Sequence, residues 1–519
     1  MPKSSLDNVR VWVARKRIAM LPVGSLRSRF LVGSFWALTG TILSQGLQLA
    51  ATIVVARWLG KTAYGQIGIV KGTVGMCGVF VGLGLGLTAV KYVSEYRVED
   101  PARAGRVASL TMTVALISGV LVSGALILVA PWLATHTLAS PSVATPLRIG
   151  AGLLFFGEVN GVQLGILSGL EAFGPMARVS LWSGLWSFPI TVAGAALWGV
   201  DGAISGLVVS LVVNCVLTHL VLRRETARLG ISFSHFATWE ESAILWKFSA
   251  PAFLASAVVT PATWICSTML VNRPNGYAEM GVYTAADQWR NVVIFLPGII
   301  SRVVLPILSS HSKDSVEGDS RFSNALDAGF SVGVLVAFPA IAALSFGGSL
   351  IAKFYGADFA AMRYPLAGLL YAAGAIALGT PVGSAVQAKG AMWFGFLNNL
   401  AWGLLLVGFF RLVFFERGAM GLSLAWAFSY LVLAVTFALF SCKIGYFPWR
   451  LGIRTSLACV CLLLFAFVPL YLSVQVSLAL LPAALLLSLV AVWIFLPSAI
   501  KQKILTTSEW MPWKGNGAF

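Results

Sequence analysis

Long runs of apolar residues, separated by short polar segments, recur along the whole chain. A helix needs about 20 apolar residues to cross roughly 30 Å of hydrocarbon, and fourteen runs reach that length. The runs are continuous rather than alternating, which favours helices over a membrane β-barrel. Their limits are 30–56, 67–90, 107–133, 147–170, 179–198, 203–222, 248–271, 281–309, 327–351, 366–388, 391–415, 420–442, 454–473 and 477–497. The pattern predicts an all-α polytopic membrane protein with about 14 transmembrane helices.

The composition agrees with this prediction. Of the 519 residues, 58% are hydrophobic and 11% are charged, whereas soluble domains carry roughly 25% charged residues. A water-soluble globule of this size is therefore excluded. The six cysteines lie in or beside the apolar runs without a CxxC pair, and we expect them to pack as small hydrophobic residues. No metal site is predicted.

The basic residues are distributed unevenly between alternate loops. If the N-terminus is cytoplasmic, the inner segments hold 25 Lys and Arg residues, the outer loops hold eight, and three lie within spans. This bias follows the positive-inside rule, with both termini in the cytoplasm. The formal net charge of +17 is then mostly a topology signal, and a nucleic-acid partner is not expected because the basic residues are dispersed among short loops.

The spans and charges divide the chain into six predicted segments. Residues 1–29 lack the apolar core and cleavage site of a signal peptide. We expect a basic cytoplasmic segment (1–29), an N-terminal lobe of six spans (30–222), a cytoplasmic linker (223–247), a C-terminal lobe of six spans (248–442), a C-terminal helix pair (443–497) and a cytoplasmic tail (498–519).

An internal repeat relates the two lobes. With an offset of 216 residues, Gly60 and Gly65 in the first outer hairpin fall on Gly276 and Gly281. Glycines thus recur at equivalent hairpins without any insertion between them. Because each repeat has an even number of spans, the lobes would share their orientation about an axis along the membrane normal.

Two spans carry polar residues on one face, although hydrocarbon penalises each of them by a few kcal/mol. On a helical wheel of about 100° per residue, one stripe is centred on Asp287. It contains Tyr283, Thr284, Asp287, Arg290, Asn291, Ser301 and Arg302, and the run 30–56 groups Ser34, Thr41, Ser44, Gln45, Gln48 and Thr52. Such stripes face another helix or water. Through the offset, spans 1, 2, 7 and 8 would wall a cavity between the lobes.

Several stretches resemble the Wzx-type oligosaccharide flippases. The sequence ARWLGKTAYGQIGIVKG at 56–72 is similar to their first hairpin and 281–309 to their eighth span, while FYGADF (354–359), AVQAKG (385–390) and ERGAMGLSLAWAFSYLV (416–432) are similar to later hairpins. The resemblance covers residues 30 to 445 and, weakly, the final helix pair. It indicates the superfamily that also holds lipid II flippases and multidrug/cation exporters.

The resemblance implies a protein of the bacterial inner membrane whose two lobes alternate around a central cavity. The implied substrate is a polyprenyl-diphosphate-linked oligosaccharide, and membrane lipids are further partners. Polysaccharide polymerase and chain-length proteins are candidate protein partners. No cofactor is implied, and the absence of a Walker lysine motif leaves no ATP site in the sequence.

The charges embedded in spans are the candidate site. Cations on a cavity face favour an anionic ligand such as a diphosphate. We predict that substrate is bound by Lys71, Arg290, Arg302, Gln45, Gln48 and Asn291, and that ion coupling involves Glu158 and Asp287.

Each of these assignments has a structural alternative. Arg290 could form an i,i+3 salt bridge with Asp287 on its own helix. Lys71 and Arg302 could extend to the membrane surface, and Glu158 could be a neutral, hydrogen-bonded acid.

Four prolines interrupt spans 7 and 8. They are Pro251, Pro261, Pro297 and Pro306, and we predict that they act as hinges. Static kinking is the alternative for each of them.

The function predicted from the sequence is transport rather than catalysis. The leading hypothesis is a flippase for lipid-linked oligosaccharides in surface polysaccharide biosynthesis. A multidrug/cation exporter of the same fold is the alternative, although its cavity should be dominated by carboxylates. A polyprenyl-sugar transferase or polymerase is disfavoured because the outer loops are short and the first of them has no Asp or Glu.

Overall fold

The computed structural model describes residues 26–82, 84–233, 238–242, 244, 257–310, 316–388, 392–444, 449–498 and 500–501. The backbone in these ranges is helical almost throughout, and no β-strand occurs in them. Nine helices among the described residues are long and apolar enough to cross a membrane. The predicted all-α membrane fold is confirmed, whereas the count of 14 spans stays a prediction.

Two long helices in the first half of the chain are bent. The described helices there are α2 (Leu26–Gly82), α3 (Leu85–Tyr96), α4 (Pro101–Trp132), α5 (Ala144–Gly169) and α6 (Phe173–Arg228). α2 joins two segments across a bend at Gly60, and α6 does so at Trp198 and Gly199. The φ angles are 79° at Gly60 and 59° at Gly199, a region that glycine adopts at little cost. The runs predicted as spans 1 and 2, and as spans 5 and 6, are therefore separate helical segments.

The prediction of one continuous helix over 67–90 is wrong. α2 ends at Gly82 and α3 begins at Leu85, and Gly84 between them has a φ of 70°. The glycine-rich stretch 82–86 therefore breaks the helix. The apolar pattern did not indicate this break because hydropathy reports burial and not backbone conformation.

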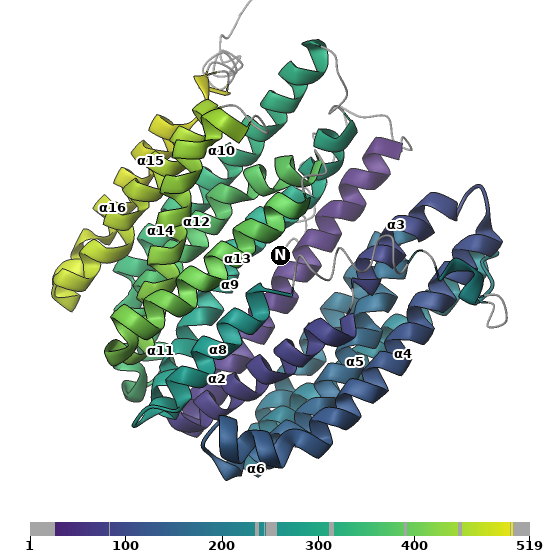
Figure 1. Cartoon of the computed structure of the whole chain (residues 1–519), viewed down its shortest axis with the longest axis horizontal. Helices are drawn as coiled ribbons and strands as arrows, with labels where there is room; N and C mark the ends of the chain where they lie inside the picture. The colour runs from purple at the N-terminus through teal and green to yellow at the C-terminus, as the bar shows by residue number, and fades with distance from the viewer. Residues whose placement is uncertain are drawn as a thin grey trace, which may run out of the picture.

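The second half continues the bundle. Its described helices are α8 (Val259–Val271), α9 (Gly276–Ser310), α10 (Val316–Phe346), α11 (Gly348–Tyr355), α12 (Arg363–Ala388), α13 (Met392–Phe409), α14 (Gly418–Ile444), α15 (Trp449–Phe467) and α16 (Val474–Phe495). Figure 1 shows α3 to α6 on one side, α10 to α16 on the other, and α2, α8 and α9 between them. The predicted limits of the two lobes stay a prediction.

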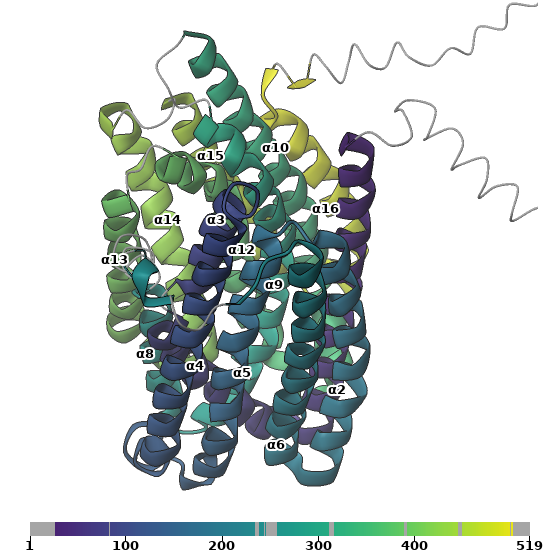
Figure 2. The same ribbon diagram turned by 90° about the vertical axis from the view of Figure 1, so that its right-hand side faces the viewer.

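Most of the long helices run roughly parallel, as membrane spans do (Figure 2). One continuous apolar core passes through both halves and includes Val70 of α2, Leu147 of α5, Ala285 of α9 and Leu370 of α12. α2 and α9 thus connect the two sides of the bundle, and the candidate site lies along their contact.

Candidate functional site

The second segment of α2 and the first turns of α9 approach each other at two glycines. A Cβ atom on Gly65 would overlap the carbonyl oxygen of Tyr277, and a Cβ on Gly281 would overlap that of Lys61. One turn farther along, a Cβ on Gly68 would overlap the hydroxyl of Thr284. Both glycines are therefore needed for this close backbone contact.

These contacts are symmetric under the 216-residue offset. Lys61 corresponds to Tyr277 and Gly65 to Gly281, so each repeat presents the same two positions to the other, as in a two-fold interface. Gly68 corresponds to Thr284, and these two residues face each other directly. A local pseudo-two-fold axis therefore passes between α2 and α9, in agreement with the predicted repeat.

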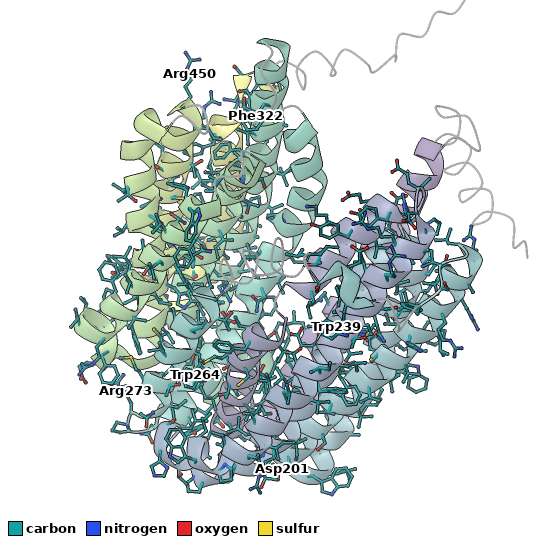
Figure 3. All side chains as sticks on the ribbon, turned by 45° about the vertical axis from the view of Figure 1, so that its right-hand side comes forward. Asp201, Trp239, Trp264, Arg273, Phe322 and Arg450 are labelled. Atoms are coloured by element: carbon teal, nitrogen blue, oxygen red, sulfur yellow. The ribbon has the colours of Figure 1, made fainter. Side chains whose placement is uncertain are left out.

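Further contacts close the same end of the bundle, which we call the hairpin end because the bend at Gly60 and the turn before Gly276 lie there. The Tyr277 hydroxyl donates to the carbonyl oxygen of Leu138 at 2.7 Å, and the Asn272 amide donates to that of Thr137 at 2.8 Å. Figure 3 shows Asp201 and Arg273 toward this end, with Phe322 and Arg450 at the opposite end.

Beyond these contacts the facing surfaces of α2 and α9 separate. Lys71 is exposed, and a Cβ on Gly72 or Gly75 would meet no atom within 4 Å. On α9, the residues from Gly281 to Ala286 are buried, whereas Asn291 and Val292 are exposed. The bundle is thus closed at the hairpin end and opens from the level of Lys71 and Asp287 toward the opposite end.

A charged cluster lies where the two helices part. Arg290 Nε donates to Asp287 Oδ1 at 2.5 Å, and Asn291 Nδ2 donates to Asp287 Oδ2 at 3.4 Å. The guanidinium carbon of Arg290 lies 4.4 Å from the ring centroid of Trp426 on α14. The intrahelical ion pair considered for Arg290 is therefore present, and the guanidinium group also packs against α14.

Lys71 occupies the position on α2 that corresponds to Asp287 on α9. The two side chains interact electrostatically, but no ion pair within 4 Å joins them among the described residues. Lys71, Asp287, Arg290 and Asn291 are therefore brought to one level of the bundle, as the helical wheel predicted for the three residues of α9.

The two glutamines are not part of this cluster. Gln45 and Gln48 lie exposed on the first segment of α2. Their neighbour Ser44, which the wheel placed on the same face, packs against Gly184 of α6. Their assignment to substrate binding stays a prediction.

Glu158 lies on α5 and faces α2 within the first half of the chain. Its carboxylate oxygens would be 3.2 and 3.3 Å from a Cβ on Gly82, beside the break between α2 and α3. No described residue is recorded as a hydrogen-bond or ion-pair partner of this carboxylate. The nearby Asn160 donates instead to Thr218 of α6 at 3.1 Å. A Cβ on Gly78 would also lie 3.7 Å from the Glu158 carboxylate. Glu158 therefore faces α2 between Gly78 and Gly82, seven to eleven residues from Lys71, or roughly 10 to 16 Å along the helix.

The predicted hinges have different surroundings. Pro261 lies in the first turn of α8, where a missing N–H costs nothing. Pro297 is buried within α9, which is assigned as a single helix from Gly276 to Ser310. Pro251 and the side chains of Pro306 and Arg302 lie outside the described residues.

Sequence reasoning missed the aromatic cluster behind Arg290. The ring centroids of Trp402 and Trp426 are 5.0 Å apart, and Tyr430 lies 5.6 Å from Trp402 and 6.1 Å from Trp426. The only sequence signal is the aromatic spacing in AWAFSY at 425–430, which is equally typical of ordinary core packing.

Residues 30–312 match the family model described as "Polysaccharide biosynthesis protein", which is more than half of the chain. The chain belongs to this family. It is also similar to the EPS I polysaccharide export inner membrane protein EpsE of Ralstonia nicotianae, with 24% identity over 85% of this chain and 93% of the relative. The corresponding protein of Ralstonia solanacearum is 23% identical over the same shares.

Solved structures share the fold of this family member. The lipid II flippase MurJ in an inward closed conformation superposes with a TM-score of 0.66 and 15% identity, covering 92% of this chain and all of that one. A multidrug resistance MATE family transporter of the MOP superfamily, in an inward-facing conformation, gives a TM-score of 0.59 and 14% identity over 82% and 98% of the two chains. The protein therefore has a fold of this transporter superfamily.

Proposed function

We propose that this protein is a flippase that carries an anionic polyprenyl-diphosphate-linked oligosaccharide from the inner to the outer leaflet of a bacterial inner membrane. The observation that carries the proposal is the position of Lys71 and Arg290. Both cations lie where the closed contact between α2 and α9 gives way to an open one. Arg290 has donors beyond the Nε that Asp287 occupies, and guanidinium groups suit phosphate oxygens.

The proposed transport cycle exchanges the closed and open ends of the bundle. If the charge bias gives the correct orientation, the hairpin end faces the outside and the open end faces the cytoplasm. The diphosphate enters from the cytoplasmic side and competes with Asp287 for Arg290 and Lys71. The contact between Gly65 and Gly281 then opens, and the substrate leaves on the outer side. Two of the similar proteins support this substrate class by their names: one is a polysaccharide export protein and the other is a lipid II flippase.

The cluster disfavours an exporter of organic cations. At the level of the cluster the carboxylate that would bind such a cation is Asp287, which is already paired with Arg290 and bonded by Asn291. The described charges at this level are two cations and one anion. We therefore retain the anionic substrate.

Arg290→Ala tests the proposal. Removing charge-assisted hydrogen bonds worth about 1.5–3 kcal/mol should slow transport about 10- to 140-fold. Translocation of a labelled lipid-linked sugar in inverted membrane vesicles measures this rate, and Arg290→Lys should restore part of it if charge alone matters.

Arg454→Ala is the matched control, because Arg454 also pairs with an aspartate, Asp327, at 3.7 Å, but on α15 and α10. Loss of transport in the Arg290 variant with retention in the Arg454 variant is expected. Equal, undiminished transport by both variants would refute the role of Arg290.

A further inference from the structure

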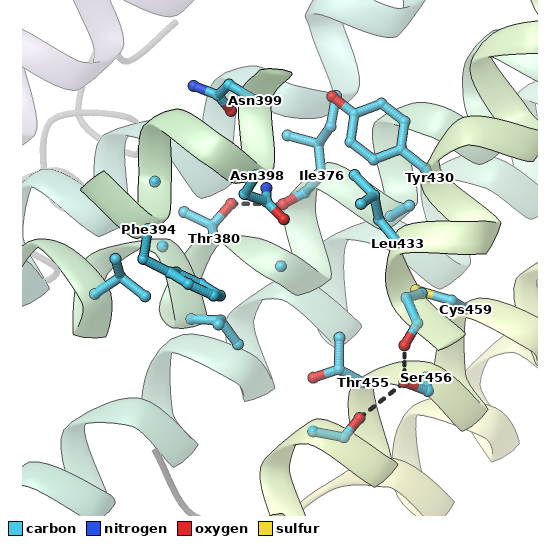
Figure 4. A pocket seen from close by; sticks show the side chains of 18 residues that line it. Ile376, Thr380, Phe394, Asn398, Asn399, Tyr430, Leu433, Thr455, Ser456 and Cys459 are labelled. Atoms are coloured by element: carbon cyan, nitrogen blue, oxygen red, sulfur yellow. Dashed lines mark hydrogen bonds between the residues drawn. The ribbon is translucent and has the colours of Figure 1, made fainter. Parts of the chain in front are cut away.

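A cavity lies within the second half of the chain, between α12, α13, α14 and α15 (Figure 4). Its volume is about 370 Å³, within the range of small-molecule sites. All four helices belong to segments long and apolar enough to span a membrane. The cavity therefore lies at membrane depth and is distinct from the cluster around Asp287.

Glycines create the space in this cavity. A Cβ on Gly379 or Gly383 of α12, or on Gly395 of α13, would meet no atom within 4 Å. Elsewhere on α12, a Cβ on Gly368 would come 2.6 Å from the carbonyl oxygen of Ser423, so that glycine permits close helix packing. The three cavity glycines are not needed for close helix packing. Their missing side chains instead leave the volume of the cavity empty.

The wall of the cavity is chemically suited to hydrocarbon. None of the described residues that line it is charged. Two of its hydroxyl groups already donate to backbone carbonyls, Thr380 to Ile376 at 2.7 Å and Ser456 to Ala434 at 2.5 Å. A diphosphate or a sugar would lose its hydration here without gaining enough partners, whereas an alkyl chain would not.

The two amide side chains of the cavity lie toward the same end, and hydroxyl and thiol groups of α15 lie toward the other. Figure 4 shows Asn398, Asn399 and Tyr430 together at that end, with Thr455, Ser456 and Cys459 of α15 at the other. An amide side chain can donate to the ester carbonyl of a phospholipid or to the phosphate oxygen that ends an isoprenoid chain. The arrangement thus suits a chain that enters from the amide end.

We propose that this cavity binds one hydrocarbon chain of a membrane lipid, with Asn398 beside the polar end of that chain. The chain comes either from a phospholipid or from the isoprenoid lipid that carries the substrate. The second source is included because Tyr430 packs on Trp426, the ring that holds Arg290. The proposal does not rest on the proposed function, since a phospholipid chain would fill the same space.

Photolabelling of the full chain in its native membrane tests this site. One arm uses a phospholipid with a diazirine midway along one acyl chain, and the other uses a polyprenyl phosphate with a diazirine on its chain. In the unsubstituted protein, adducts are expected on cavity residues such as Phe394 and Leu433. Adducts from either probe support the proposal and identify the source of the chain. If neither probe forms adducts on the cavity residues, the proposal is overturned.

Gly383→Leu should fill the cavity and reduce these adducts about tenfold, which corresponds to roughly 1.4 kcal/mol of overpacking. Gly408→Leu is the matched control, because Gly408 of α13 also has no atom within 4 Å of its Cβ position but does not line the cavity. If the Gly383 variant is labelled as strongly as the unsubstituted protein, the proposal is overturned.

If the Gly383 variant fails to fold, Gly379→Ala fills less of the same space and replaces it in the test. Because labelling is measured rather than transport, failure here is distinguishable from failure of the proposed function.

Discussion

Closure of the hairpin end should depend on the absence of a side chain at Gly281. In Gly281→Ala the new Cβ would overlap the carbonyl oxygen of Lys61, so α2 and α9 must move apart. Overpacking of this kind costs about 1–3 kcal/mol. This cost destabilises only the state in which the two helices touch. The equilibrium ratio of molecules with a closed hairpin end to those with an open one should therefore fall about 5- to 140-fold.

Labelling of a cysteine just beyond the contact measures this ratio. Gly72→Cys is suitable because a Cβ there meets no atom within 4 Å, and Cys77→Ser removes the nearby native thiol. A membrane-impermeant maleimide, added from the side of the hairpin end, should react faster in the Gly281→Ala background. Gly75→Ala, on the same helix but facing open space, should leave the rate unchanged.

The pseudo-two-fold arrangement adds a second check. Gly65→Ala should increase labelling to a similar extent, and the two substitutions together should be less than additive because both open one contact. Unchanged labelling in both single variants, with the protein folded and inserted, would refute the assignment of this contact as the closed gate.

Two further predictions concern coupling and orientation. Glu158→Gln should alter the pH or Na⁺ dependence of transport more than substrate binding, as measured in inverted vesicles with pH, Na⁺ and potential gradients imposed separately. If this variant and Asp287→Asn both keep the normal response to every gradient, ion coupling through these carboxylates is wrong. A reporter fused after Lys501 should score as cytoplasmic, and a periplasmic score would contradict the predicted topology.

The sequence predicted helices and their faces better than it predicted neighbours. Hydropathy predicted long apolar helices because hydrocarbon sets their length, but it did not predict the break between Gly82 and Leu85. The wheel grouped Asp287, Arg290 and Asn291 on one face because helix geometry is fixed, and Asp287 bonds both of the others. The same wheel placed Ser44 with Gln45, yet Ser44 packs on Gly184. Periodicity defines a face but not the element that covers it, so the contact of Arg290 with Trp426, more than a hundred residues away, had no sequence signal.

The repeat explains why Lys71 and Asp287 lie at one level of the bundle, because the two positions correspond through the offset. Positions related by a two-fold axis face each other when they lie near it, as Gly68 and Thr284 do. Positions 71 and 287 follow one turn later and also correspond through the offset. If both carried the same charged residue, two like charges would repel each other whenever the hairpin end closed, which is destabilising. Lys71 and Asp287 carry opposite charges instead, so the proposed cycle predicts that their attraction favours closure in the absence of substrate. If the proposed substrate engages Lys71 and Arg290, it removes this attraction, and substrate binding would then lower the free energy needed to open the hairpin end.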